Sequence, residues 1–314
     1  MRHIDYQANA AIEVKDLTKF YGEVRAVDGI SFEVRKGEFF GFLGPNGAGK
    51  TTTVRVLTGI ISPDGGSARV MGHQAGSLKA KQLMGVVPEM ANAYLDLTGW
   101  ENLMLMAELY GISSGERKDR AAGLLRKLEL LPRKDSLVRT YSKGMKQRLI
   151  LCMALISDPE VLFLDEPTSG LDVQSTRLIR SMLRELNRAG KTIFLTTHDM
   201  DEANDLCQRV AIIRKGKVAA IDAPEKIRLA TSKLHSVLVC LDGSVPEEEI
   251  KKLPGVNVLK IHGDKYRLYT DSPGNVVINL VNYCTDHDLR IISLSTLAPS
   301  LEDAFLALTG GESQ

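Results

Sequence analysis

The stretch GPNGAGKTT at residues 44–52 decides how the rest of the chain must fold. It satisfies the pattern G-x-x-x-x-G-K-S/T at every position, which is typical of a phosphate-binding loop. Glycines within the loop let the backbone curl, so that successive N–H groups point at phosphate oxygens. We therefore expect phosphate contacts along the whole loop, which comprises Gly44, Pro45, Asn46, Gly47, Ala48, Gly49, Lys50, Thr51 and Thr52.

The segments that flank this loop agree with that interpretation. The apolar run at residues 39–43 predicts a buried strand, and residues 52–57 predict a helix that ends at Gly59. The N-terminus of that helix would add a partial positive charge facing the phosphates. We expect Lys50 between the β- and γ-phosphates and the Thr51 hydroxyl on Mg²⁺. A glycine-rich turn that matched the pattern by accident would leave both flanks unexplained.

Length and charge set broad limits on the protein. The chain has 314 residues, enough for two domains, since single cores seldom grow much beyond about 250 residues. Lys and Arg number 40 against 39 Asp and Glu, which indicates neither a nucleic-acid-binding surface nor a polybasic membrane anchor. No apolar stretch approaches the roughly 18 residues that cross a bilayer, and residues 1–10 lack an apolar signal region. We expect a cytoplasmic protein with no membrane segment and no nucleic-acid partner.

The four cysteines are scattered through the sequence, at Cys152, Cys207, Cys240 and Cys284. They form no C-x-x-C pair and have no histidine nearby at ligand spacing, so the sequence supports neither a zinc site nor a disulfide framework. We expect all four to be buried, reduced thiols.

Strand ends later in the chain carry polar residues. Residues 161–164 are apolar at every position, as expected for a parallel strand buried on both faces, and they lead into Asp165 and Glu166. The same arrangement recurs at residues 192–197, which lead into His198, with a helical stretch between the two strands. This order predicts a doubly wound α/β layout with ligand groups at the carboxyl ends of the strands.

Two further regions accompany this core. Apolar runs and turns from residue 11 to 42 predict a small sheet, with Tyr21 in a turn-like stretch. The pattern becomes helical at about 91–157, where Ser142 is a good N-cap for a helix whose apolar positions fall on one face. Those apolar positions are 145, 149, 152, 153 and 156.

Beyond about residue 226 the pattern changes. Alternating strands and helical spacings follow in the order βαββαβ, which is that of a ferredoxin-like unit. Ser300 to Asp303 predicts the cap of a last helix. We find no catalytic set of residues in this part of the sequence.

Five motifs occur in a fixed order: the loop at 44–51, Pro88-Glu89, residues 141–145 (YSKGM), residues 164–172 (LDEPTSGLD) and His198. That set resembles the nucleotide-binding subunit of ABC transporters over residues 11 to 225. The resemblance implies an ABC-type P-loop NTPase domain at 11–226, with an α/β core, an antiparallel β subdomain and a helical subdomain at about 91–157. The C-terminal ferredoxin-like domain, at 234–310, is similar to the tail of drug-resistance-type exporter ATPases.

The resemblance implies an ATPase that uses ATP and Mg²⁺, with Lys50, Glu166 and His198 as catalytic residues. Glu166 would accept a proton from the attacking water, and His198 would donate to the γ-phosphate. Asp165 would hold Mg²⁺ together with Thr51. The alternative for Glu166 and His198 is a purely structural pair at the strand ends. Tyr21 resembles the family's adenine-stacking residue, and the alternative for it is a packed surface tyrosine.

Ser142 and Gly144 match the family's signature motif, whose helix N-terminus binds the γ-phosphate held by the opposite subunit. A head-to-tail homodimer that closes over two ATPs would follow, with Asp172 coupling the two sites. Three positions depart from the commonest pattern. Glu89 replaces a glutamine that touches Mg²⁺, and its oxygens could still accept a metal-bound water, while Lys143 and Met145 replace two residues of the signature motif.

We therefore expect an ATP-hydrolysing subunit that powers a separate ABC permease, so that the protein associates with the inner face of the cell membrane. Export is favoured by the tail and the signature, and residues 89–110 are where the family docks the permease. The alternative is a soluble ABC-type ATPase that regulates ribosomes or DNA. One P-loop, no long coiled coil and near-neutral charge count against it.

Overall fold

The chain divides into two compact units, residues 1–223 and 224–314. The computed structural model describes residues 10–90, 93–230, 235–243, 245–297 and 299–309. The first unit ends at Ala223, whereas we expected the ATPase domain to run to 226. Residues 91, 234 and 310, where three of the expected boundaries fall, lie outside the described residues.

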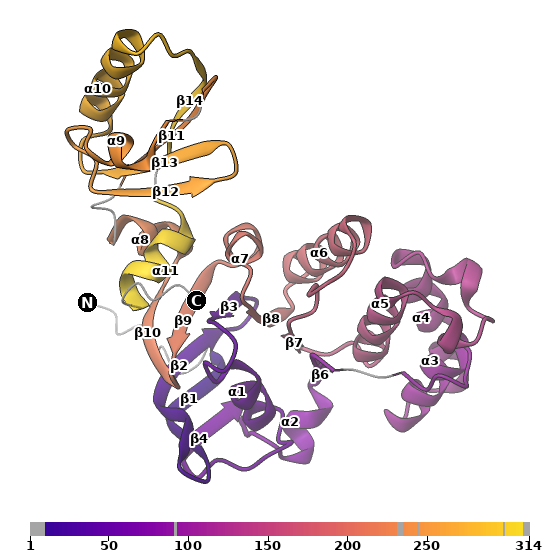
Figure 1. Ribbon diagram of the computed structural model, residues 1–314. Coiled ribbons are helices and arrows are strands. Elements are labelled where there is room, and N and C mark those ends of the chain that lie inside the picture. Colours follow the sequence, from indigo (N-terminus) through magenta and orange to yellow (C-terminus); the bar gives the residue numbers. More distant parts are fainter. Residues whose placement is uncertain (1–9, 91–92, 231–234, 244, 298, 310–314) are drawn as a thin grey trace, which may run out of the picture. The chain divides into compact units, whose positions relative to one another are not determined.

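A four-stranded antiparallel sheet forms one layer of the first unit (Figure 1), with the strand order β2-β1-β4-β5. β1 and β2 are long and are joined by a two-residue turn between Tyr21 and Val24, which pair with each other. Tyr21 therefore ends a strand and does not lie inside a turn. The strands are β1 (Ala10–Tyr21), β2 (Val24–Arg35), β4 (Gly65–Val70) and β5 (His73–Gln74).

A six-stranded mixed sheet forms the second layer, with the order β10-β9-β3-β8-β7-β6. Every residue of β3, β7 and β8 is buried, which explains why their apolar residues run together without alternating with exposed polar ones. All neighbouring pairs are parallel except the β9–β10 hairpin. The strands are β3 (Phe39–Leu43), β6 (Met84–Val87), β7 (Val161–Asp165), β8 (Thr192–Thr197), β9 (Arg209–Arg214) and β10 (Lys217–Asp222).

The hydrophobic core lies between these two sheets and includes α1 (Lys50–Leu57), which contacts strands of both. Five phenylalanine rings from both sheets meet there with centroids 5.4–6.0 Å apart. Such pairs contribute about 0.5–1.5 kcal/mol each beyond the area they bury. The rings belong to Phe32, Phe40, Phe42, Phe163 and Phe194. This packing holds the helix that follows the phosphate-binding loop in a fixed position.

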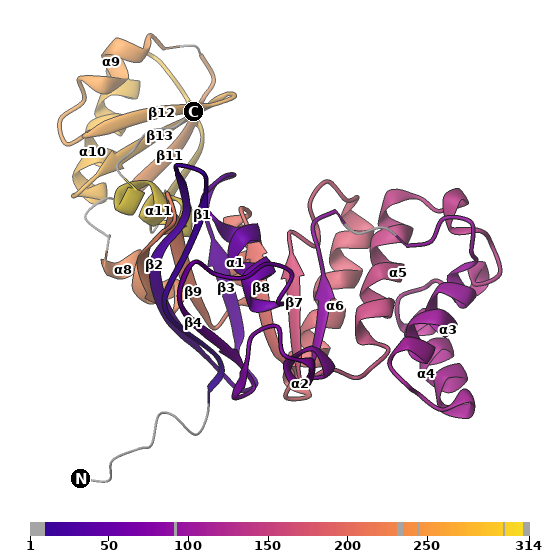
Figure 2. The same ribbon diagram turned by 90° about the horizontal axis from the view of Figure 1, so that it is seen from below.

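Three helices pack together beside the β6 edge of the mixed sheet (Figures 1 and 2). The last of them, α5, contacts α3, α4, α6 and β6, so every residue from Leu149 to Leu155 is buried. Our expectation of a single apolar face on this helix was wrong, because it is surrounded. The helices of the unit are α2 (Leu78–Gln82), α3 (Gly99–Leu109), α4 (Ser114–Lys127), α5 (Lys143–Leu155), α6 (Val173–Arg188) and α7 (Met200–Leu206), with 3-10 turns at Leu131–Arg133 and Val138–Thr140.

The second unit has the predicted βαββαβ order and an antiparallel sheet β12-β13-β11-β14. The two central strands of this sheet are β13 and β11, the third and first strands of the motif, and β12 and β14 lie at its edges. This is the ferredoxin-like arrangement. α10 contacts β11 and β14, and α8 contacts α11. The elements are α8 (Pro224–Ala230), β11 (His235–Leu241), α9 (Glu247–Lys251), β12 (Val258–His262), β13 (Lys265–Thr270), α10 (Pro273–Asp286), β14 (Ile291–Leu297) and α11 (Leu301–Thr309).

Asp303 fastens α11 to this sheet. It accepts hydrogen bonds from the backbone and hydroxyl of Ser300, from Arg267 at 2.7 Å and from the Tyr269 hydroxyl at 2.9 Å. Burial alone would raise the pKa of Asp303, but the bonds from Ser300 and Tyr269 and the charge of Arg267 outweigh it and lower that pKa. The sequence motif at 300–303 is therefore a helix cap that also ties the helix to β13.

Two further expectations concerned the cysteines and the absence of a membrane segment. All four cysteines are buried free thiols, and burial raises the pKa of Cys152 and Cys207. Within the described part of the chain, no helix combines the length and the apolar character that a bilayer crossing requires.

We predict that Asp303→Asn lowers the stability of the second unit by about 1–3 kcal/mol at neutral pH, because it removes the charge from several hydrogen bonds. The folded-state pKa is lowered, so this stabilisation is complete above the unfolded carboxyl's pKa and is lost as pH falls through the folded value. Hydrogen exchange of the β11 and β13 amides would measure it. Glu302→Gln, an exposed neighbour, is the control, and equal exchange in both variants would contradict the prediction.

Candidate active site

The parallel register brings four strand ends to one edge of the mixed sheet. Val87 pairs with Leu164, Leu164 with Leu195, and Leu43 with Thr197. The residues that follow each strand, namely Glu89, Asp165 with Glu166, the phosphate-binding loop and His198, therefore emerge side by side. This is the edge at which α/β sheets bind ligands.

The phosphate-binding loop packs closely against β2 at Gly49. Gly49 has φ of 108°, and a Cβ there would overlap the carbonyl oxygen of Ala26. An L-residue could take neither that backbone angle nor that space without strain. The loop then enters α1 at Lys50, so the helix N-terminus and the loop N–H groups share one concave surface. That surface fits the phosphates of a nucleotide.

Lys50 is 5% exposed, and its ammonium group is surrounded by oxygens. Nζ donates to the carbonyl oxygens of Gly44 at 2.7 Å and Pro45 at 3.3 Å. It also lies 3.2 Å from Oε1 of Glu166. The amine is thus held at the floor of the loop, beside the carboxylate that sequence analysis singled out.

Glu166 lies between Lys50 and His198. Its Oε2 is 2.8 Å from His198 Nδ1, and its Oε1, which faces Lys50, is buried without a hydrogen-bond partner in the described part of the chain. Its backbone N–H donates to the Thr196 carbonyl at 3.1 Å, and its φ is 51°. A non-glycine residue in this region costs about 1–3 kcal/mol, so the surrounding structure must hold it there. Strain of this kind often occurs at functional sites.

Asp165 is the last residue of β7 and is 2% exposed. Its carboxylate accepts a hydrogen bond from the Thr196 hydroxyl on the neighbouring strand β8. Our sequence analysis missed Thr196, although a polar residue inside an apolar parallel strand was a signal for it. Thr196 fixes Asp165 through its side chain and Glu166 through its carbonyl, so it positions both acidic residues.

A cavity of about 330 Å³ opens beside the loop. Glu89, Glu166 and Tyr21 line it, and Tyr21 is 48% exposed with the Lys19 ammonium 6.0 Å from the centre of its ring. Ala26, which our sequence analysis did not predict, also lines it. The lining residues are Tyr21, Ala26, Pro45, Asn46, Gly47, Gly49, Lys50, Thr51, Thr52, Glu89 and Glu166. Most of the predicted nucleotide contacts therefore share one space.

Ser142, Gly144 and Asp172 do not line that cavity. They meet each other where α5 begins and α6 begins. The Ser142 hydroxyl accepts from the Met145 N–H at 3.2 Å, and Asp172 caps α6 by accepting from the Ser175 N–H at 2.8 Å. That backbone bond and the Ser175 hydroxyl lower the pKa of Asp172. These three residues therefore lie at the starts of α5 and α6, outside the cavity.

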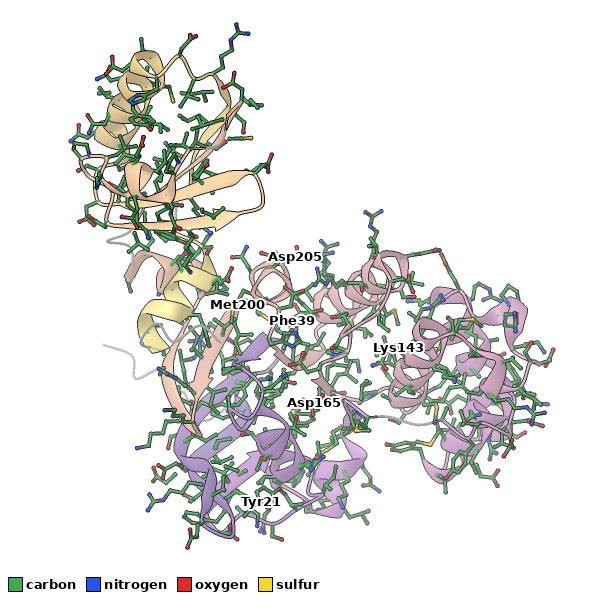
Figure 3. All side chains as sticks on the ribbon, viewed as in Figure 1. Tyr21, Phe39, Lys143, Asp165, Met200 and Asp205 are labelled. Carbon is green, nitrogen blue, oxygen red and sulfur yellow. The ribbon has the colours of Figure 1, made fainter. Side chains whose placement is uncertain are left out.

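Close packing between α5 and α6 requires a glycine at position 144. A Cβ at Gly144 would overlap the Ser175 hydroxyl and lie 2.9 Å from the Ser175 Cβ. Lys143, labelled in Figure 3 at the start of α5, donates from Nζ to the Ser169 carbonyl at 3.0 Å. The start of α5 is therefore joined to the segment that runs from Glu166 to Asp172.

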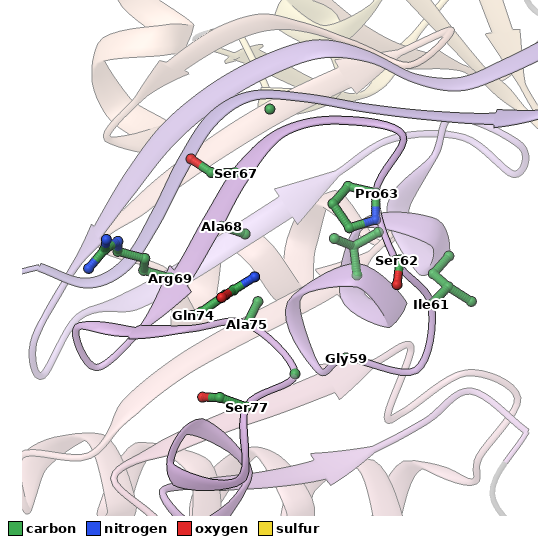
Figure 4. Close-up of a pocket in the computed structure, with 13 residues that line it drawn as sticks. Gly59, Ile61, Ser62, Pro63, Ser67, Ala68, Arg69, Gln74, Ala75 and Ser77 are labelled. Atoms are coloured by element: carbon green, nitrogen blue, oxygen red, sulfur yellow. The ribbon is translucent and has the colours of Figure 1, made fainter.

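A larger cavity, of about 560 Å³, lies between α1 and the strands β4 and β5 (Figure 4). Among the described residues that line it, Arg69 alone is charged, and its guanidinium donates to the Gly72 carbonyl. The lining is Val56, Gly59, Ile61, Ser62, Pro63, Gly66, Ser67, Ala68, Arg69, Gln74, Ala75, Gly76 and Ser77. It offers no acid, base or metal-binding group, so the smaller cavity is the candidate active site.

Comparison with known proteins agrees with this geometry. Residues 27–169 match the family model described as ABC transporter. The linearmycin resistance ATP-binding protein LnrL of Bacillus subtilis (strain 168) is 37% identical over 95% of this chain and 98% of its own length. The chain belongs to the ABC transporter family. The Nod factor export ATP-binding protein I of Paraburkholderia xenovorans (strain LB400) is 41% identical over 97% of this chain and 99% of its own length.

The fold of this ABC ATPase is shared by a solved dimeric ATP-binding cassette in a post-hydrolysis state, bound to ADP and phosphate. The TM-score is 0.63 with 27% identity, over 68% of this chain and 98% of the cassette. The comparison covers a share of the chain similar to that of its first unit. It confirms the expected P-loop ABC ATPase fold.

The three departures from the family's commonest motifs occupy different environments in this ABC ATPase. Glu89 is exposed and lines the cavity. Lys143 contacts the Ser169 carbonyl, and Met145 is half-buried on the first turn of α5. Lys143 thus has a contact that the glycine more common at this position could not make, since glycine has no side chain.

We predict that Gly49→Ala lowers the affinity for ATP by at least about tenfold, because the added Cβ strains the backbone and overlaps the Ala26 carbonyl. Titration with a fluorescent ATP analogue would measure the dissociation constant. Gly123→Ala, which places a Cβ in open space on α4, is the matched control. Equal affinity of the Gly49 variant and the control would contradict this view of the loop.

Proposed function

We propose that this ABC ATPase hydrolyses Mg²⁺-bound ATP as a homodimer and so powers export through a separate membrane permease. The observation that carries the catalytic part is the position of Glu166. Its carboxylate is buried, faces Lys50 at 3.2 Å and His198 at 2.8 Å, and lies on the wall of the cavity at the phosphate-binding loop. No other carboxylate in the described part of the chain has all of these neighbours.

The residues around the loop fit both ATP and Mg²⁺. Thr51, Asp165 and Glu89 offer oxygen donors only, which is the ligand set that Mg²⁺ prefers. The metal would supply neutralising charge to the transferring phosphoryl group when bound. Lys50 would move from the oxygens it now contacts toward the β- and γ-phosphates, and Tyr21 would stack on the adenine.

Glu166 is the proposed general base. Once Lys50 turns to the phosphates, the Oε1 atom that has no hydrogen-bond partner is available to accept a proton from the attacking water. His198 keeps its Nδ1 on the other carboxylate oxygen, which fixes the orientation of the ring. A protonated imidazole would then donate from Nε2 to the γ-phosphate.

The proposed dimer is head-to-tail. Ser142 and Asp172 are exposed, and neither they nor Gly144 line their own chain's cavity, so a partner's nucleotide is the ligand that they would meet. The free N–H groups at the start of α5 suit the γ-phosphate. The solved relative bound to ADP and phosphate is itself dimeric.

A permease and the direction of transport are supported by the relatives and by one surface. The relatives described above are named for resistance and export, which favours transport over a role on ribosomes or DNA. Within residues 89–110, exposed apolar side chains include Met90, Tyr94, Leu95 and Leu109. We propose that they contact the permease and hold this protein at the inner face of the membrane. Trp100, Met104 and Met106, which lie in the same range, are only half-exposed.

We predict that Glu166→Gln retains ATP binding but lowers turnover by at least about a hundredfold, because the amide cannot accept the proton. The variant should elute as a dimer with ATP during size-exclusion chromatography, since the nucleotide persists. Glu160→Gln, just before the opposite end of the same strand, is the control. Normal turnover, or a monomer with ATP bound, would contradict the assignment.

The transport role predicts that the tagged protein co-purifies with a multi-spanning membrane protein from detergent extracts. Replacing Leu109 and Leu95 by serine should reduce that recovery several-fold while ATP hydrolysis by the isolated protein persists, because both side chains are exposed. Mass spectrometry of the recovered material would identify the permease. Recovery with ribosomes or DNA in place of a membrane protein would favour the alternative.

A further inference from the structure

A buried carboxylate outside the motifs described above lies close to the active site. Glu202, on α7, has a side chain that is 1% exposed. Its Oε1 accepts a hydrogen bond from the Thr168 hydroxyl at 2.7 Å and lies 3.2 Å from Nε of Arg180 on α6. Figure 3 labels Met200 and Asp205 near the two ends of the helix that carries it. This cluster therefore joins three separate segments of the chain.

Arg180 extends the same cluster to Asp199. Its second nitrogen lies 2.9 Å from Oδ2 of Asp199, while Oδ1 of that residue accepts from the backbone of Asp201 and Glu202. Asp199 directly follows His198, and Thr168 lies two residues after Glu166. The cluster thus holds the chain on both sides of the contact between Glu166 and His198.

The free-energy cost of burying the Glu202 carboxylate argues against a role for this residue in packing alone. The second oxygen of Glu202, Oε2, is buried and has no hydrogen-bond partner in the described part of the chain. Leaving a charged group so incompletely paired is costly, and an apolar side chain of similar size would fill the same space without that cost. In some proteins a buried ion pair fixes one geometry, and the segment that this pair contacts follows Glu166, whose φ is 51°.

That segment needs fixing because Glu166 has φ of 51° and the chain then runs to Asp172 without a helix or strand. Its internal backbone bonds, such as Ser169 N–H to the Glu166 carbonyl, are 3.2 Å long. Beyond Glu166 it is held from outside by Glu202 at Thr168 and by Lys143 at Ser169. Of these two, only Glu202 is buried and charge-compensated.

We propose that Glu202 and Thr168 are positioning residues for ATP hydrolysis. Through the Thr168 hydroxyl, Glu202 fixes the turn after Glu166. Arg180 fixes the direction of the Glu202 side chain and also holds Asp199, next to His198. The inference rests on the proposed role of Glu166 as the general base. Glu202 and Thr168 would act on the geometry of Glu166 and not on nucleotide binding, since neither of them lines the cavity.

The test compares Thr168→Val, which removes the hydroxyl but keeps the shape, with Thr168→Ser, which keeps the hydroxyl. Thr168→Val should lower kcat by about tenfold with KM for ATP changed by less than about threefold, and Thr168→Ser should recover most of that loss. Glu202→Gln should also lower kcat, since the amide loses its charge toward Arg180. Arg184→Met is the matched control, because it breaks an exposed ion pair with Asp205 between the same two helices and should leave both constants unchanged.

Nucleotide binding and thermal melting of each variant separate the possible outcomes. A Thr168→Val enzyme with normal kcat, or a loss that Thr168→Ser fails to restore, would overturn the positioning role. Loss of kcat only in proportion to lost folded protein would overturn it as well. If Glu166→Gln turns over normally, the base itself is wrongly assigned; if Glu166→Gln is inactive and Thr168→Val is not, only the present inference fails.

Discussion

The parallel pairing of β3, β7 and β8 is the constraint on which the site depends. Every residue of these strands is buried, so each side chain fills a place in the packing on one face of the sheet, and a shift of register would disrupt that packing on both faces. With that register fixed, the phosphate-binding loop, the two acidic residues and His198 leave the sheet at the same level. The contacts of Glu166 with Lys50 and His198 are consequences of strand pairing between segments that are far apart in the sequence, since β3 pairs with β8 and β8 with β7.

Much of the fold could be predicted because the pattern and the environment agree. The apolar runs became the buried strands, and Ser142 caps a helix as its position indicated. The ferredoxin-like order also followed from strand and helix spacing, and the pairing order in the structure confirms it. In each case the feature depends on the chemistry of a few adjacent residues.

Other features could not be read because they depend on contacts between distant segments. Ala26 matters because its carbonyl lies against Gly49, and Ser175 because its side chain leaves no room for a Cβ at Gly144. Glu202 looks like any acid on a short polar helix until folding brings Arg180 and Thr168 to it. Sequence motifs identify the residues that carry out the chemistry. The residues that position them can be identified only from contacts in the folded structure.

The two parts of the site are connected within a single chain. The segment from Glu166 to Asp172 begins at the proposed base and ends at the cap of α6, and Lys143 and Gly144 contact it from the start of α5. The same segment is held at Thr168 by Glu202. The left-handed backbone of Glu166 therefore leads directly into two supports, at Thr168 and Ser169, that tie the following turn to α7 and to the start of α5.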